Sequence, residues 1–212
     1  MNIDELSWPS TGDEAFGPGS DKNLLSRTLA RFDRFNSSSK DFLIADGFRE
    51  AADRIIATLE EEKHFHNADM LVFPVAYLYR HSIELMLKQL ISEGLSLHLL
   101  DDCESLQATL RGHNLSALWK HTRKAIEGFW PNSERADLEA TEKTILAFDA
   151  LDRSGQAFRY GKNIKGQPNL VDAPAQVELR ELRRVMTGVF NLLGGCLDAF
   201  SDALSNMLDN YR

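Results

Sequence analysis

The chain has 212 residues, a hydrophobic content of 43% and a formal net charge of −8 at pH 7. This size and apolar content predict one domain with a real core, and the acidic excess excludes a protein that coats nucleic acid or anionic membrane by bulk charge, though not one with a local basic patch. Cys103 and Cys196 lie far apart without metal-type spacing, and the sequence has neither a secretory signal nor an apolar run of membrane-spanning length, which predicts a soluble, cytoplasmic protein without a membrane partner.

The N-terminal forty residues differ in composition from the rest. Residues 1–40 are rich in Gly, Pro, Ser and Asp around one short amphipathic stretch, LLSRTLARFDRF, and we predict an irregular arm that carries a short helix. From residue 41 onward, apolar residues recur every three or four positions, which is the spacing of amphipathic helices. A first core helix ends in the charged sequence EEEKHFHN, and a second runs from about Ala68 to Glu93, with Gly94 as its predicted C-terminal cap.

The second half of the chain continues the helical pattern. After a loop through LSLHLLDDCESLQATLRG, a third helix is predicted over HNLSALWKHTRKAIEGF with Asn114 as its N-cap. A fourth helix follows the predicted cap residue Ser133, has helical apolar spacing from Glu134 to Asp152 and ends near Ser154 and Gly155. The next 17 residues, QAFRYGKNIKGQPNLVD, have no clear period and are predicted to form an ordered loop.

A final helix is predicted over residues 174–211, where Gly194 and Gly195 indicate a kink or a close helix contact. No segment alternates like a strand, and the sequence contains no internal repeat. We therefore predict an all-α fold: an up-and-down helical bundle of about five main helices over residues 41–212, preceded by the irregular arm over residues 1–40.

The second predicted helix carries a polar stripe. At 100° per residue its polar members fall within one arc of about 120°; they are Tyr77, Arg80, His81, Glu84, Lys88 and Ser92. Leucine, isoleucine, valine and methionine border this stripe on both flanks, which places the helix at the centre of a bundle, where charges must be paired or used. This favours a functional site. The alternative is a solvated ladder of i, i+4 ion pairs, Arg80 with Glu84 and Glu84 with Lys88, worth a few tenths of a kcal/mol each.

Three sequences in chain order, YRHSIELMLKQLI, GHNLSALWK and FRYGKNIKGQ, resemble the HEPN superfamily of helical-bundle proteins over roughly residues 41–205. The resemblance implies an all-α bundle, often a homodimer, that acts as a metal-independent ribonuclease in toxin-antitoxin, abortive-infection or other defence systems. Other members are inactive partners of nucleotidyltransferases. The ribonuclease members carry an Arg followed after four to six residues by His, and this chain has no such pair, so their catalytic pair cannot be transferred to it.

The candidate site is therefore a different constellation drawn from several helices. Its predicted catalytic residues are Arg80, His81, Glu84, His113 and Arg159, and its predicted RNA- or nucleotide-binding residues are Tyr77, Lys88, Tyr160, Lys162 and Lys165. Metal-independent RNA cleavage needs a base, an acid and a cation for the transition state. Either histidine would carry the proton, and Arg80 or Arg159 would hold the phosphate.

The loop lysines would track a phosphate backbone together with a cluster of arginines at the start of the final helix, namely Arg180, Arg183 and Arg184. Tyr160 would stack on a base. The alternative for these residues is a solvated face and an aromatic side chain packed in the core.

Other signals are weak. The sequence HFHNAD lacks further ligands for a metal site, and phosphate-loop, dinucleotide and serine-hydrolase motifs are absent from the sequence, so we expect neither a metal nor a cofactor. Two other functions stay open. One is a non-catalytic helical interaction module that forms a homodimer or binds a nucleotidyltransferase or antitoxin partner, and the other is a bundle whose polar stripe holds a small anion or nucleotide.

Overall fold

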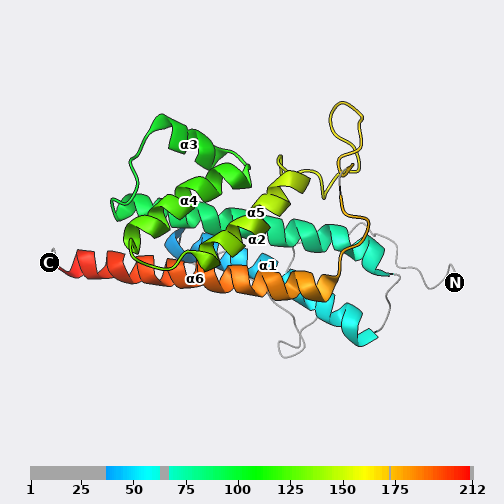
Figure 1. The fold of residues 1–212 in the computed structure, drawn as a ribbon, viewed down its shortest axis with the longest axis horizontal. Helices are drawn as coiled ribbons and strands as arrows, with labels where there is room; N and C mark the ends of the chain where they lie inside the picture. Colours follow the sequence, from blue (N-terminus) through cyan, green and yellow to red (C-terminus); the bar gives the residue numbers. More distant parts are fainter. Residues whose placement is uncertain (1–36, 63–66, 172, 211–212) are drawn as a thin grey trace, which may run out of the picture. The chain divides into compact units, whose positions relative to one another are not determined.

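The computed structural model describes residues 37–62, 67–171 and 173–210. The described residues belong to the unit Ser37–Arg212, and the predicted arm with its short helix lies almost wholly outside them. The described unit contains six helices (Figure 1): α1 (Ser37–Glu62), α2 (Ala68–Ser96), α3 (Glu104–Arg111), α4 (Leu115–Phe129), α5 (Ala136–Leu151) and α6 (Leu179–Asn210). Its one described β feature is an isolated antiparallel bridge between Lys162 and Pro168, so the all-α prediction is confirmed.

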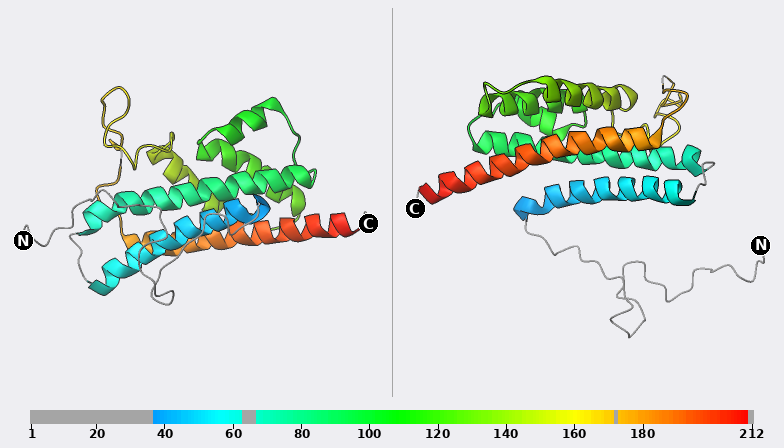
Figure 2. Two further views of the ribbon diagram at one scale, coloured as in Figure 1. Left: turned by 180° about the vertical axis from the view of Figure 1, so that it is seen from behind. Right: turned by 60° about the horizontal axis from the view of Figure 1, so that its bottom comes forward.

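Helix α2 lies at the centre of the packing. It contacts α1, α4 and α6, while α5 contacts α4 and α6 (Figure 2). The apolar residues on both flanks of α2 explain this position, because each flank buries its side chains against a different neighbour. The fully buried apolar residues of α2 are Val75, Tyr79, Ile83, Leu87, Leu90 and Ile91. The polar stripe of α2 is covered by two segments from elsewhere in the chain, the one at His113 and the one at Asp152, whose carbonyl oxygens both bind Arg80.

Gly94 is not the C-terminal cap of α2, and that prediction was wrong. The helix continues through Gly94 to Ser96, and the residue that takes the left-handed conformation is His98, with φ 58°. A Cβ atom at position 94 would lie 3.0 Å from the Cβ of Ala125 on α4. The glycine therefore allows α2 and α4 to approach closely, and its missing side chain is a packing feature rather than a helix stop.

The connections between helices differ from the prediction in two places. The predicted loop before Asn114 contains the short helix α3, which is stabilised because Leu106 is 1% exposed and packs into the core. Ser133 does not cap the following helix, since α5 starts at Ala136 and the Ser133 hydroxyl donates to the Trp130 carbonyl instead. Asn114 is confirmed as the N-cap of α4, because its side-chain oxygen accepts the amide of Ala117 at 2.6 Å.

Helix α6 runs without interruption through Gly194 and Gly195. A Cβ atom at either position would meet nothing within 4 Å, so no close contact within the described part of the chain requires these two glycines. None of the described helices is long and apolar enough to span a bilayer.

Candidate functional site

Arg80 of α2 is one of the largest fully buried side chains among the described residues, with 1% of its surface exposed. Its Nη1 donates to Glu84 Oε2 at 2.9 Å, and its Nη2 donates to the His113 carbonyl oxygen at 2.5 Å. Its Nε donates to the carbonyl oxygen of Asp152 at 2.9 Å. All three guanidinium nitrogens thus bind protein groups from three separate segments, which makes Arg80 a structural cation.

Glu84 sits one helical turn beyond Arg80 and is also buried. Its second oxygen, Oε1, accepts a hydrogen bond from Lys88 Nζ at 2.8 Å and lies 2.8 Å from His113 Nδ1. Burial alone would raise the pKa of Glu84, but the hydrogen bonds from Lys88, His113 and Arg80 outweigh it and lower the pKa to about 2. Glu84 is therefore a carboxylate at neutral pH, and both of its oxygens are occupied by cationic or imidazole donors.

The ion pairs in the middle of the polar stripe are buried, so they are not the solvated ladder that the sequence left open. Both i, i+4 ion pairs form, but the side chains of Arg80 and Glu84 are only 2% and 4% exposed. A surface ladder would leave both charges in water. Here they form a buried network, and removing one of its charged side chains would leave the opposite charge buried without a partner.

Asp152, directly after α5, completes the network from the opposite side. Its Oδ1 accepts the backbone amides of Gln156 and Ala157 at 2.8 and 2.9 Å, which fixes the turn that follows α5. Its Oδ2 is buried and lies 3.4 Å from Arg80 Nε. The two atoms do not form a hydrogen bond, because the Nε–H of Arg80 points at the Asp152 carbonyl oxygen. The carboxylate and carbonyl of one residue thus face the same guanidinium.

The turn after Asp152 contacts two arginines. Gly155 has φ +75°, and a Cβ atom on it would lie 3.2 Å from Arg80 Nη1. The carbonyl oxygen of Gly155 accepts Nε and Nη2 of Arg159 at 3.2 and 2.9 Å. A glycine is required here both for the left-handed backbone and for the close approach of Arg80.

Asp149, on the last turn of α5, positions the start of α4. It is 3% exposed, and its Oδ1 accepts the amide of Leu115 at 3.0 Å. Together with the Asn114 cap, this fixes the segment that carries His113 against α2. The sequence prediction missed Asp149 and Asp152. The signal was present, since the sequence FDALD places two carboxylates three residues apart at the end of an apolar helix.

Aromatic and cationic side chains adjoin the buried network at its exposed edge. The rings of Tyr77 and His81 are stacked, with centroids 5.8 Å apart and planes 8° apart, and Phe48 of α1 packs edge-on against His81 at 4.6 Å. The guanidinium of Arg159 lies 5.3 Å from the ring centroid of Tyr77 and 5.6 Å from that of Tyr160. We call the set formed by Tyr77, His81, Lys88, His113 and Arg159 the cationic surface.

The two histidines of the cationic surface have different environments. His81 is half-buried, and burial lowers its pKa, while the charges of Glu84, Arg80, Lys88 and Arg159 act on it in opposite senses, which keeps its imidazole neutral at neutral pH. His113 has a side chain that is 62% exposed. Because the Glu84 carboxylate can only accept a hydrogen bond, Nδ1 of His113 donates to it, and Nε2 has no hydrogen-bond partner among the described residues.

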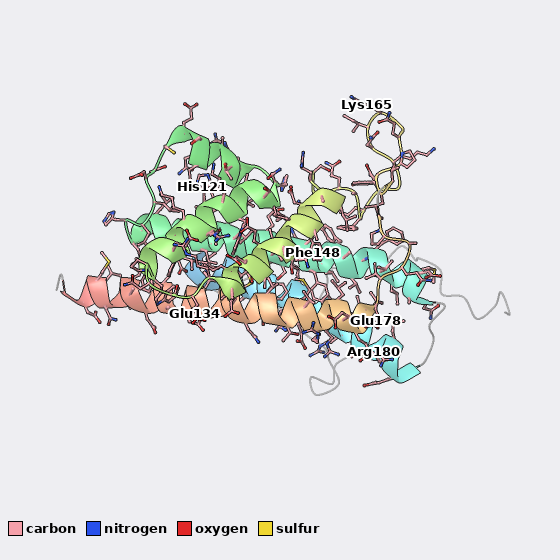
Figure 3. All side chains as sticks on the ribbon, in the orientation of Figure 1. His121, Glu134, Phe148, Lys165, Glu178 and Arg180 are labelled. Atoms are coloured by element: carbon pink, nitrogen blue, oxygen red, sulfur yellow. The ribbon has the colours of Figure 1, made fainter. Side chains whose placement is uncertain are left out.

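The loop lysines and the helix arginines do not form one basic patch. Lys162 and Lys165 are exposed on the loop that projects from the helices, with Lys165 near its outer end (Figure 3). At the start of α6, Arg180 and Arg183 lie within 4 Å of Glu60, and Arg184 pairs with Glu181. The α6 arginines are therefore neutralised by neighbouring carboxylates.

The predicted site residues thus fall into three groups. Arg80, Glu84, Lys88 and His113 form one hydrogen-bonded network, and Tyr77, His81, Arg159 and Tyr160 form an adjoining stack. Lys162 and Lys165 stand apart on the loop. His64 and His66 lie outside the described residues, and within the described ranges no group of three or more His, Cys, Asp or Glu is placed to hold a metal ion.

Comparison with known proteins adds no family assignment. No protein-family model, no curated protein and no solved structure matches the chain.

Proposed function

We propose that the protein is a HEPN-like helical protein that binds RNA or a nucleotide at the cationic surface, in a cytoplasmic stress, toxin-antitoxin or phage-defence setting. The observation that carries this proposal is the exposed imidazole of His113, which Glu84 holds beside Lys88 of α2. His81 lies on the same helix, and Arg159, from the turn after α5, packs on Tyr77 of that helix. Imidazole, ammonium and guanidinium groups are the side chains that bind phosphate.

The length of the surface also suits a strand of nucleotides. From Tyr77 to Lys88 the helix rises about 16 Å at 1.5 Å per residue, which exceeds the roughly 3.4 Å rise between stacked nucleotides several times. Tyr77 and Tyr160 offer ring faces for base stacking, with Arg159 next to both. The phosphate-binding role belongs to Arg159 rather than to Arg80, because Nη1 of Arg159 has no hydrogen-bond partner among the described residues.

Cleavage of the bound RNA is the catalytic form of this proposal. A neutral His81 is suited to take a proton from the 2′-hydroxyl. His113 takes part in this step as an imidazolium: its Nδ1–H stays bound to Glu84, and its Nε2–H passes to the leaving oxygen. Glu84 then orients His113, and Arg159 holds the phosphate oxygens as negative charge develops on them. No metal ion is needed for these steps.

The test measures binding and cleavage separately. Purified wild type is titrated into a fluorescent single-stranded oligoribonucleotide and into a labelled mononucleotide, with chelator present throughout. Arg159→Gln and His113→Gln are expected to weaken binding by about tenfold or more each, since each removes a side chain that donates a hydrogen bond to phosphate. His81→Gln is expected to abolish cleavage while changing binding less than Arg159→Gln does.

Matched controls are available on the same fold. His121→Gln removes a partly exposed imidazole in the middle of α4, and Arg184→Gln removes an exposed guanidinium that pairs with Glu181. Both controls should bind RNA like the wild type. Binding that survives in Arg159→Gln and His113→Gln, or that falls equally in the controls, would remove the cationic surface as the site.

A second candidate function is a helical interaction module, and an apolar groove favours it. The groove, of about 1790 Å³, lies between α2, α5 and α6 and includes Phe73, Phe148 and Leu192. It is larger than the roughly 300–1,000 Å³ of small-molecule sites, which suits a protein segment. Phe73 and Met70 are 45% and 66% exposed beside it. A second copy of the chain supplies both the exposed apolar side chains and the groove that accepts them, so we favour a homodimer over a nucleotidyltransferase or antitoxin partner.

Light scattering on wild type and on Phe73→Asp tests this second candidate. The wild type should have the mass of a dimer and the variant that of a monomer. A monomeric wild type at high concentration would leave the groove to a different protein and would exclude the homodimer.

A further inference from the structure

The segment from Tyr160 to Asn169 forms a projecting hairpin, which we call the 160–169 hairpin (Figure 1). The antiparallel bridge between Lys162 and Pro168 closes it, and Asn169 Nδ2 donates to the carbonyl oxygen of Tyr160 at 2.6 Å at its base. Asn163 fixes the tip, because its side-chain oxygen accepts the amides of Lys165 and Gln167 at 2.9 and 3.1 Å. The backbone of the hairpin is therefore pre-organised by its own hydrogen bonds.

The side chains of Lys162, Ile164 and Lys165 at the tip of this hairpin are exposed. Ile164 is 97% exposed, the most exposed of the large apolar residues described. Lys162 and Lys165 flank it, and neither lies within 4 Å of a described carboxylate. An apolar side chain held fully in water between two uncompensated cations has no stabilising role in this chain, which points to a partner that covers it.

The charge around the hairpin is opposite to that of the whole protein. Residues 153–171 contain four basic side chains and no acidic one, whereas the chain carries a net charge of −8. The hairpin continues directly from Arg159 and Tyr160, which are stacked at 5.6 Å. A polyanion that occupies the cationic surface would therefore meet further unpaired cations along the hairpin.

We infer that the 160–169 hairpin is a docking arm for single-stranded RNA. In this arrangement Lys162 and Lys165 contact successive phosphates of the RNA. Ile164 packs on an unstacked base that lies further along the RNA than the base on Tyr160. This inference rests on the proposed function and deepens it, because it makes the ligand an RNA strand rather than a mononucleotide. Single strands suit such an arm, since their unstacked bases are open to apolar and aromatic contact.

An anionic membrane is the competing partner for a tip of this composition. Stable membrane attachment takes two independent signals or a cluster of four to eight basic residues, and this tip has two lysines and one isoleucine. The continuity with the aromatic rings of Tyr160 and Tyr77 also favours a ligand with bases. The observations therefore favour RNA, and the membrane becomes an outcome of the test.

The test compares two ligands on one set of full-length proteins. The hairpin variant combines Lys162→Gln, Ile164→Ser and Lys165→Gln, and the control variant combines Lys120→Gln and Lys143→Gln at exposed positions of α4 and α5. Each is titrated with labelled oligouridylate and with labelled uridine monophosphate at several salt concentrations. The hairpin variant should bind oligouridylate about tenfold or more weakly, with the slope of log K against log salt reduced by about 1.4 for two lost contacts, and should bind the mononucleotide like the wild type.

Each other outcome overturns the inference. Wild-type affinity of the hairpin variant for oligouridylate would refute the docking arm and leave the proposed function standing, because the cationic surface still binds. Failure of the wild type to bind either ligand would refute both. Hairpin-dependent sedimentation with vesicles of phosphatidylcholine and phosphatidylserine, without RNA binding, would assign the tip to a membrane.

Discussion

Arg80 and Arg159 both contact the turn at Gly155, but one is buried and the other is exposed. Arg80 reaches Gly155 from inside, is 1% exposed and binds Glu84, His113 and Asp152 through all three of its nitrogens. Arg159 reaches the carbonyl oxygen of the same glycine from outside, is exposed and has no described carboxylate within ion-pair distance. One arginine is fixed by the fold, and the other is left for a ligand.

The difference between these two arginines separates the structural part of the site from its binding part. A buried guanidinium must be satisfied by the protein, because an unpaired buried charge costs several kcal/mol. An exposed guanidinium keeps its solvation and can exchange water for phosphate oxygens. The buried network thus holds α2, α4 and the turn after α5 together, and the cationic surface lies on top of that frame.

The largest expected effect is on stability, and it contrasts the two arginines directly. Arg80→Met leaves the carboxylates of Glu84 and Asp152 without their buried partner and should lower the free energy of unfolding by about 3–5 kcal/mol. Arg159→Met should change it by less than about 0.5 kcal/mol, as for most surface substitutions. Denaturation in urea measures both. Equal losses would mean that Arg159 belongs to the structural frame as well.

The second effect is a pH dependence that originates in the buried network. The pKa of Glu84 is lowered from 4.5 to about 2 in the folded state, so its contribution is complete above pH 4.5 and is lost as the pH falls toward 2. The contribution is roughly 3 kcal/mol at neutral pH, at about 1.4 kcal/mol per unit. Glu84→Gln should flatten the acid limb of the unfolding free energy measured between these pH values.

Glu139→Gln, at an exposed position of α5, is the matched control for Glu84→Gln. An acid limb that is flattened equally in both variants would show that the network does not determine the acid sensitivity of the fold.

The third effect concerns the glycine between the two arginines. Gly155→Ala introduces a left-handed alanine and a Cβ atom 3.2 Å from Arg80 Nη1, and should cost about 1–2 kcal/mol of unfolding free energy. Gly161→Ala, where a Cβ atom meets nothing within 4 Å, should cost much less. Thermal unfolding of the two variants gives the comparison, and a tolerated Gly155→Ala would refute the close approach of Arg80.

The smallest effect belongs to His81, which lies between the two regions. Burial lowers its pKa in the folded state, so protonation favours unfolding, and stability should fall slightly as the pH drops below 6.5. His81→Gln should remove this dependence, and His98→Gln, on the exposed turn after α2, controls for loss of an imidazole. Melting temperatures measured from about pH 7 to pH 5 would show it.

Local features of the fold followed from the sequence because they depend on neighbours a few residues away. The helical class, the N-cap at Asn114 and the polar stripe of α2 all come from spacing along one helix, and each agrees with the structure. Gly94 and Ser133 were assigned to caps by the same local rules and proved to have other roles. Their surroundings, Ala125 on α4 for Gly94 and the Trp130 carbonyl for Ser133, cannot be derived from cap preferences.

The sequence by itself determined that Arg80, Glu84 and Lys88 share one face of a helix with apolar flanks, because the 3.6-residue period fixes directions around the axis. Only the tertiary structure decided which of these charges are buried. The Nε of Arg80 binds a carbonyl oxygen 72 residues away, and Glu84 binds a histidine 29 residues away. Burial is a property of what covers a side chain, and the segments that cover α2 are brought there by the packing of the whole bundle rather than by the sequence around it.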